Sequence, residues 1–365
     1  MNNRNNINKR EMVSRLESDR QLMPPLNIRV IQSEVQFGTR VADALLQVEW
    51  QGKSAKFATE IKASSTPKTL QVAMDKMIAM DLPAGTYPMV IVPYLKEENL
   101  VLLEARNVSG MDMCGNGVVR CDNFMVFRSG QPNRYIASSP IKNIYARNSS
   151  MVARAFLQRS TFPNVQAILA EVNARNLLVS KYARTPMRQS TVSKCLKSLE
   201  EDLIVGRKDG IRLLQSDKLL AELAENYRPP IRNRRISCKA PAGTDPMTAL
   251  SEAAKKTSLP VSLTGLSSVN CYAVMQRGET MQAYCPNITQ LFEQSSLVEA
   301  NRFAEIELFE VSEEPVYFDC RENVVGVCAT SPVQTYLELM SGDKRDKETA
   351  DQVKAFIFSE LERRP

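Results

Sequence analysis

Two carboxylates and a lysine near the N-terminus are spaced so that they could hold a metal ion beside a phosphate group. Asp43 begins one segment that reads as a strand, and Glu60 and Lys62 lie near the end of the next. Residues two apart in a strand share a face, so Glu60 and Lys62 point together, and Asp43 can approach Glu60 across a hairpin. Carboxylate oxygens bind magnesium, which activates water. The pattern is that of a magnesium-dependent nuclease, or of ordinary charges on an exposed strand.

The segments around these residues predict an α/β domain over residues 27–148. Residues 1–26 are polar and predict a flexible N-terminal tail. Alternation of apolar and polar residues predicts strands, and apolar residues at helical spacing predict helices. The expected elements are a helix at 27–36, a hairpin of strands at 44–50 and 54–62, a helix at 67–80 with Gln71, a buried strand at 87–93, a helix at 101–106, and strands at 118–121 and 124–127.

The arrangement Asp43…Glu60-Ile61-Lys62, followed by Gln71, resembles the PD-(D/E)xK nuclease fold over roughly residues 27–135. The resemblance implies a restriction-endonuclease-like α/β domain in which Asp43 and Glu60 hold Mg²⁺. It implies a catalytic group of Asp43, Glu60, Lys62 and Gln71. No proline precedes Asp43, where the family's name places one. The same fold also serves DNA binding or structure alone.

A second candidate for function is a helix followed by a basic hairpin. Residues 189–199 carry apolar side chains at helical spacing on one face and polar or basic side chains on the other. Ser190 or Thr191 is expected to cap this helix. Residues 203–205 and 211–213 predict two strands joined by a turn at 208–210. The expected buried face consists of Val192, Cys195, Leu196 and Leu199.

This layout is typical of a winged helix-turn-helix, which we expect over residues 149–228. Its second helix would enter the major groove of duplex DNA, and its hairpin would contact phosphates. Helices are expected at 149–157, 164–173 and 177–184 before it, and at 217–227 after it. The residues expected to bind DNA are Arg188, Gln189, Ser190, Thr191, Ser193, Lys194, Lys197, Arg207, Lys208 and Arg212.

Charge is distributed unevenly along the chain and is most positive around this helix. Residues 1–150 carry a net charge of +5, residues 151–240 of +9 and residues 241–365 of −8. Positive charge is what phosphate contacts require. The alternative is a solvated surface of uneven charge.

Composition excludes several classes of protein. The chain has 365 residues and no histidine, which excludes histidine-based nucleases and serine–histidine or cysteine–histidine nucleophile pairs. No C-x-x-C pair occurs among the eight cysteines, so a zinc site is not expected. No apolar run is long enough to span a membrane, and no secretory signal begins the chain. The sequence predicts a cytoplasmic protein without a membrane partner.

The rest of the chain predicts a basic linker at 229–244 and an α+β domain at 245–365. The linker could lie along DNA phosphates or simply be solvated. Ser331 is expected to cap a helix that has Pro332 in its first turn and Gly342 after its end. Other expected elements are a helix at 246–256, strands at 271–275, 304–311 and 316–318, and a final helix at 347–362.

A string in this last part is similar to the C-terminal signature of AbiEi-type antitoxins, which are regulators of type IV toxin–antitoxin systems. It runs from Gly326 to Met340 and continues through Arg345 and Glu348-Thr-Ala350; residues 316–319 and 263–265 fit the same pattern. Residues 111–116 and the winged helix resemble the longer members of this family, which carry a nuclease-like N-terminal domain ahead of the helix-turn-helix. The resemblance implies repression of the protein's own operon and a nucleotidyltransferase-like toxin as counterpart. The better-known antitoxins carry the winged helix at the N-terminus, whereas here it is central.

The sequence therefore predicts an α/β and α+β multidomain regulator that binds double-stranded DNA, as a homodimer on its site, with no cofactor. The rival from another class is a Mg²⁺-dependent DNA nuclease directed by the winged helix. A third alternative is a structural or plasmid-maintenance protein whose acidic last third binds a protein partner.

Overall fold

The computed structural model describes residues 7–135, 143–180, 184–208, 210–274, 280–300, 302–322 and 327–363. It divides the chain into two compact units, residues 1–142 and 143–365. Each unit has buried apolar clusters of its own and combines helices with β-sheet. The expected mixture of α/β and α+β parts in a multidomain chain is confirmed at this level.

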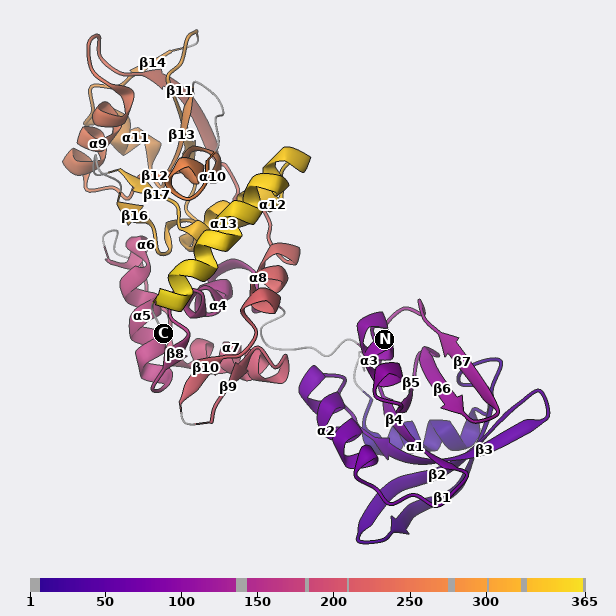
Figure 1. Cartoon of the computed structure of the whole chain (residues 1–365). Coiled ribbons are helices and arrows are strands. Elements are labelled where there is room, and N and C mark those ends of the chain that lie inside the picture. The colour runs from indigo at the N-terminus through magenta and orange to yellow at the C-terminus, as the bar shows by residue number, and fades with distance from the viewer. Residues whose placement is uncertain are drawn as a thin grey trace. The chain divides into compact units, whose positions relative to one another are not determined.

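The first unit is built on a seven-stranded sheet whose strands lie side by side in sequence order (Figure 1). β1, β2 and β3 are antiparallel neighbours, whereas β3, β4 and β5 run parallel to one another. β4 is rich in Val and Ile and buried along its second half, which is typical of a central parallel strand. The elements described here are α1 (Lys9–Ser18), β1 (Asn27–Phe37), β2 (Arg40–Trp50), β3 (Lys53–Ile61), α2 (Pro67–Ile78), β4 (Thr86–Val92), α3 (Glu97–Ala105), β5 (Ser109–Asp112), β6 (Gly117–Cys121) and β7 (Phe124–Arg128).

Both faces of this sheet are covered. Along β3, Phe57 and Ile61 join one apolar cluster and Ala58 joins another, as the alternation of a strand requires. The first cluster includes Met12 and Leu16 of α1, and the second includes the buried residues of α2 and α3.

Two predictions for this unit are wrong. Part of the expected flexible tail is α1, because Asn8 caps it with a capping box and Met12 and Leu16 bury one face. Residues 27–37 form β1 instead of a helix, since they pair with β2 along the strand. The expected hairpin at 44–50 and 54–62, the helix from residue 67 and the strand at 87–93 are confirmed within a few residues.

The second unit begins with short helices around a small sheet. The strands of that sheet lie in the order β8–β10–β9, and both pairings are antiparallel. The elements are η1 (Arg147–Ser149), α4 (Ser150–Phe156), β8 (Thr161–Phe162), α5 (Val165–Arg175), α6 (Leu177–Ser180), α7 (Gln189–Glu201), β9 (Val205–Gly206), β10 (Ile211–Leu213) and α8 (Ser216–Glu225). Part of the helix expected at 177–184 lies outside the described residues.

The remainder of the second unit surrounds a mixed sheet in the order β14–β11–β15–β13–β12–β17–β16. Ser331 caps α12 by accepting a hydrogen bond from the Gln334 amide, with Pro332 at the start, as expected. The elements are β11 (Arg234–Lys239), α9 (Pro246–Thr257), β12 (Ser262–Leu263), α10 (Gly265–Ser268), η2 (Val269–Cys271), β13 (Met281–Cys285), α11 (Ile288–Glu293), β14 (Val298–Glu299), β15 (Ile306–Glu310), η3 (Glu314–Tyr317), β16 (Arg321–Glu322), β17 (Cys328–Ala329), α12 (Pro332–Met340) and α13 (Lys344–Arg363).

Three further predictions are corrected here. The expected linker at 229–244 contains β11, which pairs with β15 and β14 and so is held within the sheet. The strand expected at 271–275 is wrong at its start, where residues 269–271 form the 3-10 helix η2, and its last residue, 275, lies outside the described part. The strand expected at 316–318 is wrong, because residues 314–317 form the 3-10 helix η3, with Pro315 in its first turn.

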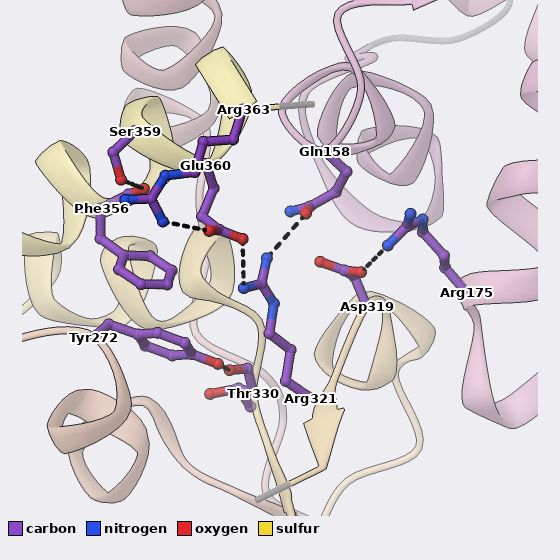
Figure 2. Close-up of polar contacts among 10 residues, drawn as sticks. All are labelled: Gln158, Arg175, Tyr272, Asp319, Arg321, Thr330, Phe356, Ser359, Glu360 and Arg363. Carbon is purple, nitrogen blue, oxygen red and sulfur yellow. Dashed lines mark hydrogen bonds and ion pairs between the residues drawn. The ribbon is translucent and has the colours of Figure 1, made fainter. Parts of the chain in front are cut away.

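Ion pairs and hydrogen bonds join the helical part of the second unit, from η1 to α8, to its C-terminal part, from β11 to α13. Figure 2 shows Arg321 between Gln158 of the helical part and Glu360 of α13, and Arg175 against Asp319. Asn176 also forms an isolated β-bridge with Phe318. The two predicted domains, 149–228 and 245–365, thus belong to one compact unit.

Candidate nucleic-acid interface

One face of α7 anchors the helix in the second unit. Val192, Cys195, Leu196 and Leu199 are all buried, as their spacing predicts. They face the α4 and α5 side, since α7 contacts both helices. Burial raises the pKa of the Cys195 thiol to about 11, so this cysteine is a packing residue at neutral pH.

The opposite face of α7 carries the polar and basic residues. Thr191 and Ser193 are half-buried along this helix. A solvated row of hydroxyl, amide and cationic groups on a convex helix can meet base edges and phosphates. The exposed residues at its start and along it are Arg188, Gln189, Ser190, Lys194 and Lys197.

The hairpin after α7 adds three exposed cations. Arg207 and Lys208 follow β9, and Arg212 lies in β10. β10 also pairs with β8, a two-residue strand that the sequence analysis did not predict. Asp209, at the expected turn, lies outside the described residues.

Hydrogen bonds fix the chain where α7 begins. The Met187 amide donates to Asn173 Oδ1 at 2.8 Å, and Asn173 Nδ2 donates back to the Met187 carbonyl at 3.3 Å. Gln166 Nε2 donates to Gln189 Oε1 at 2.9 Å. Arg188 stands at the N-cap without a side-chain cap, so the expected cap by Ser190 or Thr191 is wrong; both lie inside the helix.

The acidic end of α7 has partners within the fold. Tyr145 donates its hydroxyl proton to Asp202 Oδ2 at 2.5 Å, and Arg207 Nε lies 3.3 Å from Glu200 Oε2. These contacts set the position of the helix end and of the first residue of the hairpin. The Arg207 guanidinium also offsets part of the negative charge of Glu200, which would otherwise repel a phosphate.

The carboxylate–lysine cluster of the first unit is assembled differently from expectation. Glu60 and Lys62 point together as predicted, with Lys62 Nζ 2.7 Å from Glu60 Oε1. Lys76 of α2 lies 2.5 Å from Glu60 Oε2. The buried carboxylate of Glu60 is thus held by two lysines, whose side chains are each about one third exposed.

Asp43 uses its two oxygens on other partners. Oδ1 accepts from Lys9 Nζ at 2.6 Å and Oδ2 from the Ile61 amide at 2.7 Å. Gln71 lies half-buried on α2. Asp43 therefore stands beside the end of β3, next to the Glu60 segment, with its carboxylate already bonded.

A magnesium ion does not fit these residues as they stand. Three lysine ammonium groups occupy the carboxylate oxygens that it would need. Within the described ranges, acidic and cysteine side chains form no group of three that could hold a metal.

Sequence reasoning missed Lys9 and Lys76. Met12 and Leu16 stand four residues apart, an apolar spacing that signals the helix on which Lys9 lies. Lys76 has no comparable signal, because its distance to Glu60 depends on how α2 packs against β3.

Comparison with known proteins adds no relative: no family model, curated protein or solved structure matches the chain. Within the described ranges, every helix is too short or too polar to cross a bilayer.

Proposed function

We propose that this protein is a DNA-binding transcriptional regulator whose winged helix-turn-helix spans residues 149–228. In this assignment α5 and α7 are the helix pair, α7 is the recognition helix, and β9 and β10 form the wing. The observation that carries the proposal is the exposed polar and basic face of α7 beside three exposed cations of the hairpin. The opposite face of α7 is buried, so this side alone is open to a ligand.

Positive charge supports this assignment. Residues 151–240 have a net charge of +9, and Arg207 offsets part of the charge of Glu200 at the acidic end of α7. Binding would begin with phosphate contacts by Lys197, Lys208 and Arg212, which fix the register of α7. Arg188, Gln189 and Lys194 would then read base edges, and a homodimer would read a two-fold symmetric site.

The biological role we propose is that of antitoxin and autorepressor in a type IV toxin–antitoxin operon. Its support is the similarity of the string around Gly326–Met340 to AbiEi-type antitoxins. Most of this string belongs to α12, which is largely buried and packs against α13, so its part is structural. The counterpart would be a nucleotidyltransferase-like toxin encoded nearby.

The experiment selects bound sequences from random duplexes and then measures their affinity. Replacing Arg188 by alanine is expected to cost about 1–3 kcal/mol at one base pair if Arg188 reads guanine. Replacing Lys194 as well should relax the selected sequence further. If the double variant binds every duplex as tightly as the unmodified protein, α7 is not the reading helix.

Magnesium-dependent DNA cleavage remains the second candidate for the first unit. One observation favours it: Asp43 of β2 and Glu60 of β3 lie on adjacent paired strands, with Lys62 just after β3 and α2 following, as the PD-(D/E)xK resemblance expects. The helix that the resemblance places before these strands is strand β1 instead. The lysine pairs on both carboxylates oppose it. A fold of this kind can also serve DNA binding without cleavage.

A further inference from the structure

A cavity of about 670 Å³ opens beside η1 in the second unit. Its lining comes from η1 and α4, from the chain after α8, from the start of η3 and from Gln334 of α12. Segments of the helical part and of the C-terminal part thus share its wall.

A buried arginine lines this cavity. Arg154 of α4 is only 3% exposed, and its Nη1 donates to the Pro315 carbonyl at 2.9 Å and to Gln334 Oε1 at 2.8 Å. Its Nε has no hydrogen-bond partner. Burying a guanidinium without a directly paired carboxylate is costly, and burial lowers the pKa of Arg154 to about 10.

The nearest carboxylate in the hydrogen-bond network of Arg154 belongs to Glu338, and Gln334 lies between the two side chains. Gln334 Nε2 donates to Glu338 Oε1 at 2.8 Å, so the amide of Gln334 stands between the two charges. Glu338 Oε2 accepts from the Gly265 amide at 2.8 Å and from the Tyr284 hydroxyl at 3.2 Å. This carboxylate is therefore committed on both oxygens, and among the described residues Arg154 donates its hydrogen bonds to a carbonyl and an amide oxygen instead of a carboxylate.

The rest of the lining favours an anion. Arg147, Arg184 and Arg228 are exposed at the cavity, and with Arg154 they outnumber its two acidic residues. Those acids have partners in the fold: Glu313 Oε1 accepts from the Ile231 amide at 2.7 Å, and Glu314 Oε2 from Asn176 Nδ2 at 2.8 Å.

We propose that this cavity binds a small anion carrying phosphate or carboxylate groups, with Arg154 at its wall and Arg147 and Arg228 at its rim. The volume suits a ligand the size of a mononucleotide. Charge-assisted hydrogen bonds from several arginines are the usual means of holding such groups.

The cavity wall is also in contact with α7, which gives the anion a route to the DNA-binding surface. Tyr145 lines the cavity and bonds Asp202, the C-cap residue of α7. An anion that shifts the segment 145–150 therefore shifts the end of α7. This regulatory part rests on the proposed function, whereas the binding site does not.

Calorimetric titration of the full chain, without DNA, tests the site. The probes are ADP, citrate and inorganic phosphate. They show whether the site prefers a nucleotide, a carboxylate or free phosphate, and adenosine is the uncharged control. We expect ADP or citrate to bind, adenosine not to bind, and the double variant Arg147→Ala with Arg228→Ala to weaken binding at least tenfold. The exposed Lys347→Ala on α13 serves as the matched control and should bind as the unmodified protein does.

Because both variant positions are exposed, the double variant should keep its fold, which circular dichroism checks. Failure of all three anions to bind, or equal binding by the double variant, overturns the proposed site. A second titration measures duplex affinity with and without saturating ADP or citrate, and a change of threefold or more is expected. If the anion binds and duplex affinity stays constant, the regulatory part is wrong. If the duplex does not bind even without the anion, the proposed function fails instead.

Discussion

Arg207 in the hairpin lies with its Nε 3.3 Å from Glu200 Oε2 at the end of α7. The two side chains are 39% and 29% exposed, so the pair lies at the surface and joins the hairpin to α7. Arg207 differs in this from Lys208 and Arg212, neither of which forms an ion pair with α7 within the described part of the chain. A cation already shared with a carboxylate has less charge to offer a phosphate.

Alanine variants of the hairpin should therefore differ in their effect on DNA. Arg212→Ala is expected to weaken binding to all duplexes about equally and to lower the slope of log affinity against log salt by roughly one. Arg207→Ala should change affinity and slope less. Fluorescence anisotropy over a series of salt concentrations measures both, with Lys347→Ala as control. Equal losses for Arg207 and Arg212 would contradict the shielding by Glu200.

The turn after β5 depends on one buried carboxylate. Asp112 accepts hydrogen bonds at 2.8 Å from the amides of Leu95, Cys114 and Asn116, and at 2.7 Å from Asn116 Nδ2. Removing it leaves several buried donors without an acceptor, each costing about 1–3 kcal/mol. Asp112→Ala should thus lower the free energy of unfolding of the first unit by about 3 kcal/mol or more.

Urea unfolding of the full chain, followed by the fluorescence of Trp50 in the first unit, measures this loss. Trp50 is the single tryptophan of the chain and contacts Phe124, so its signal reports on this unit. Exposed Asp81→Ala is the matched control and should unfold as the unmodified protein does. A midpoint for Asp112→Ala equal to that of the control would mean that water replaces the carboxylate.

Local patterns in the sequence were enough to predict most of the elements near the candidate interface. The apolar spacing of Val192, Cys195, Leu196 and Leu199 gave α7, and the turn signals after Leu203 gave the hairpin. The signals that failed were short or overridden by packing. β8 has two residues and no periodicity to detect, and residues 27–37 become β1 because β2 offers an edge to pair with.

Contacts between distant segments could not be predicted in the same way. That Glu60 meets Lys76, and that Arg154 meets Gln334, depends on how helices pack on sheets and on each other. Arg154 lies in the helix expected at 149–157, and nothing in its local sequence marks a buried charge. The cavity beside η1 could likewise not be predicted from the sequence, because its walls come from five separate stretches of chain.

Stability should depend on pH through Glu338. Burial raises the pKa of this carboxyl above its ordinary value of 4.5, although Gln334, Gly265 and Tyr284 donate hydrogen bonds that oppose the rise. The folded state thus holds the proton more tightly than the unfolded state does. The unmodified protein therefore loses stability as pH rises from below 4.5 to the raised pKa.

Glu338→Gln removes this titration while keeping an oxygen to accept from Gly265. We expect the stability of the variant, relative to the unmodified protein, to improve as pH is raised from 4 to 7. Urea unfolding of the full chain at each pH, followed by far-ultraviolet circular dichroism, measures the difference, and Trp50 fluorescence identifies the part of the transition that belongs to the first unit. The control is Glu362→Gln at an exposed position on α13. Its free energy of unfolding should differ from that of the unmodified protein by the same amount at every pH. A constant difference for Glu338→Gln would refute the raised pKa.

Cleavage of DNA in magnesium separates regulator from nuclease. Because Lys62 and Lys76 occupy both oxygens of Glu60, and Lys9 one oxygen of Asp43, we expect the unmodified protein to leave supercoiled and linear duplexes intact. The same lysines should also stabilise the fold. Lys76→Ala would leave the buried Glu60 carboxylate with one partner fewer, which should lower the free energy of unfolding by about 1 kcal/mol because Lys76 is partly exposed.

For cleavage, the assay compares incubation of DNA with the protein in Mg²⁺ or Mn²⁺ and in EDTA. The opposite outcome is that the unmodified protein cleaves DNA and that Lys62→Ala abolishes cleavage while DNA binding is retained. That outcome would make the first unit a nuclease and show that the metal displaces the lysines from the carboxylates.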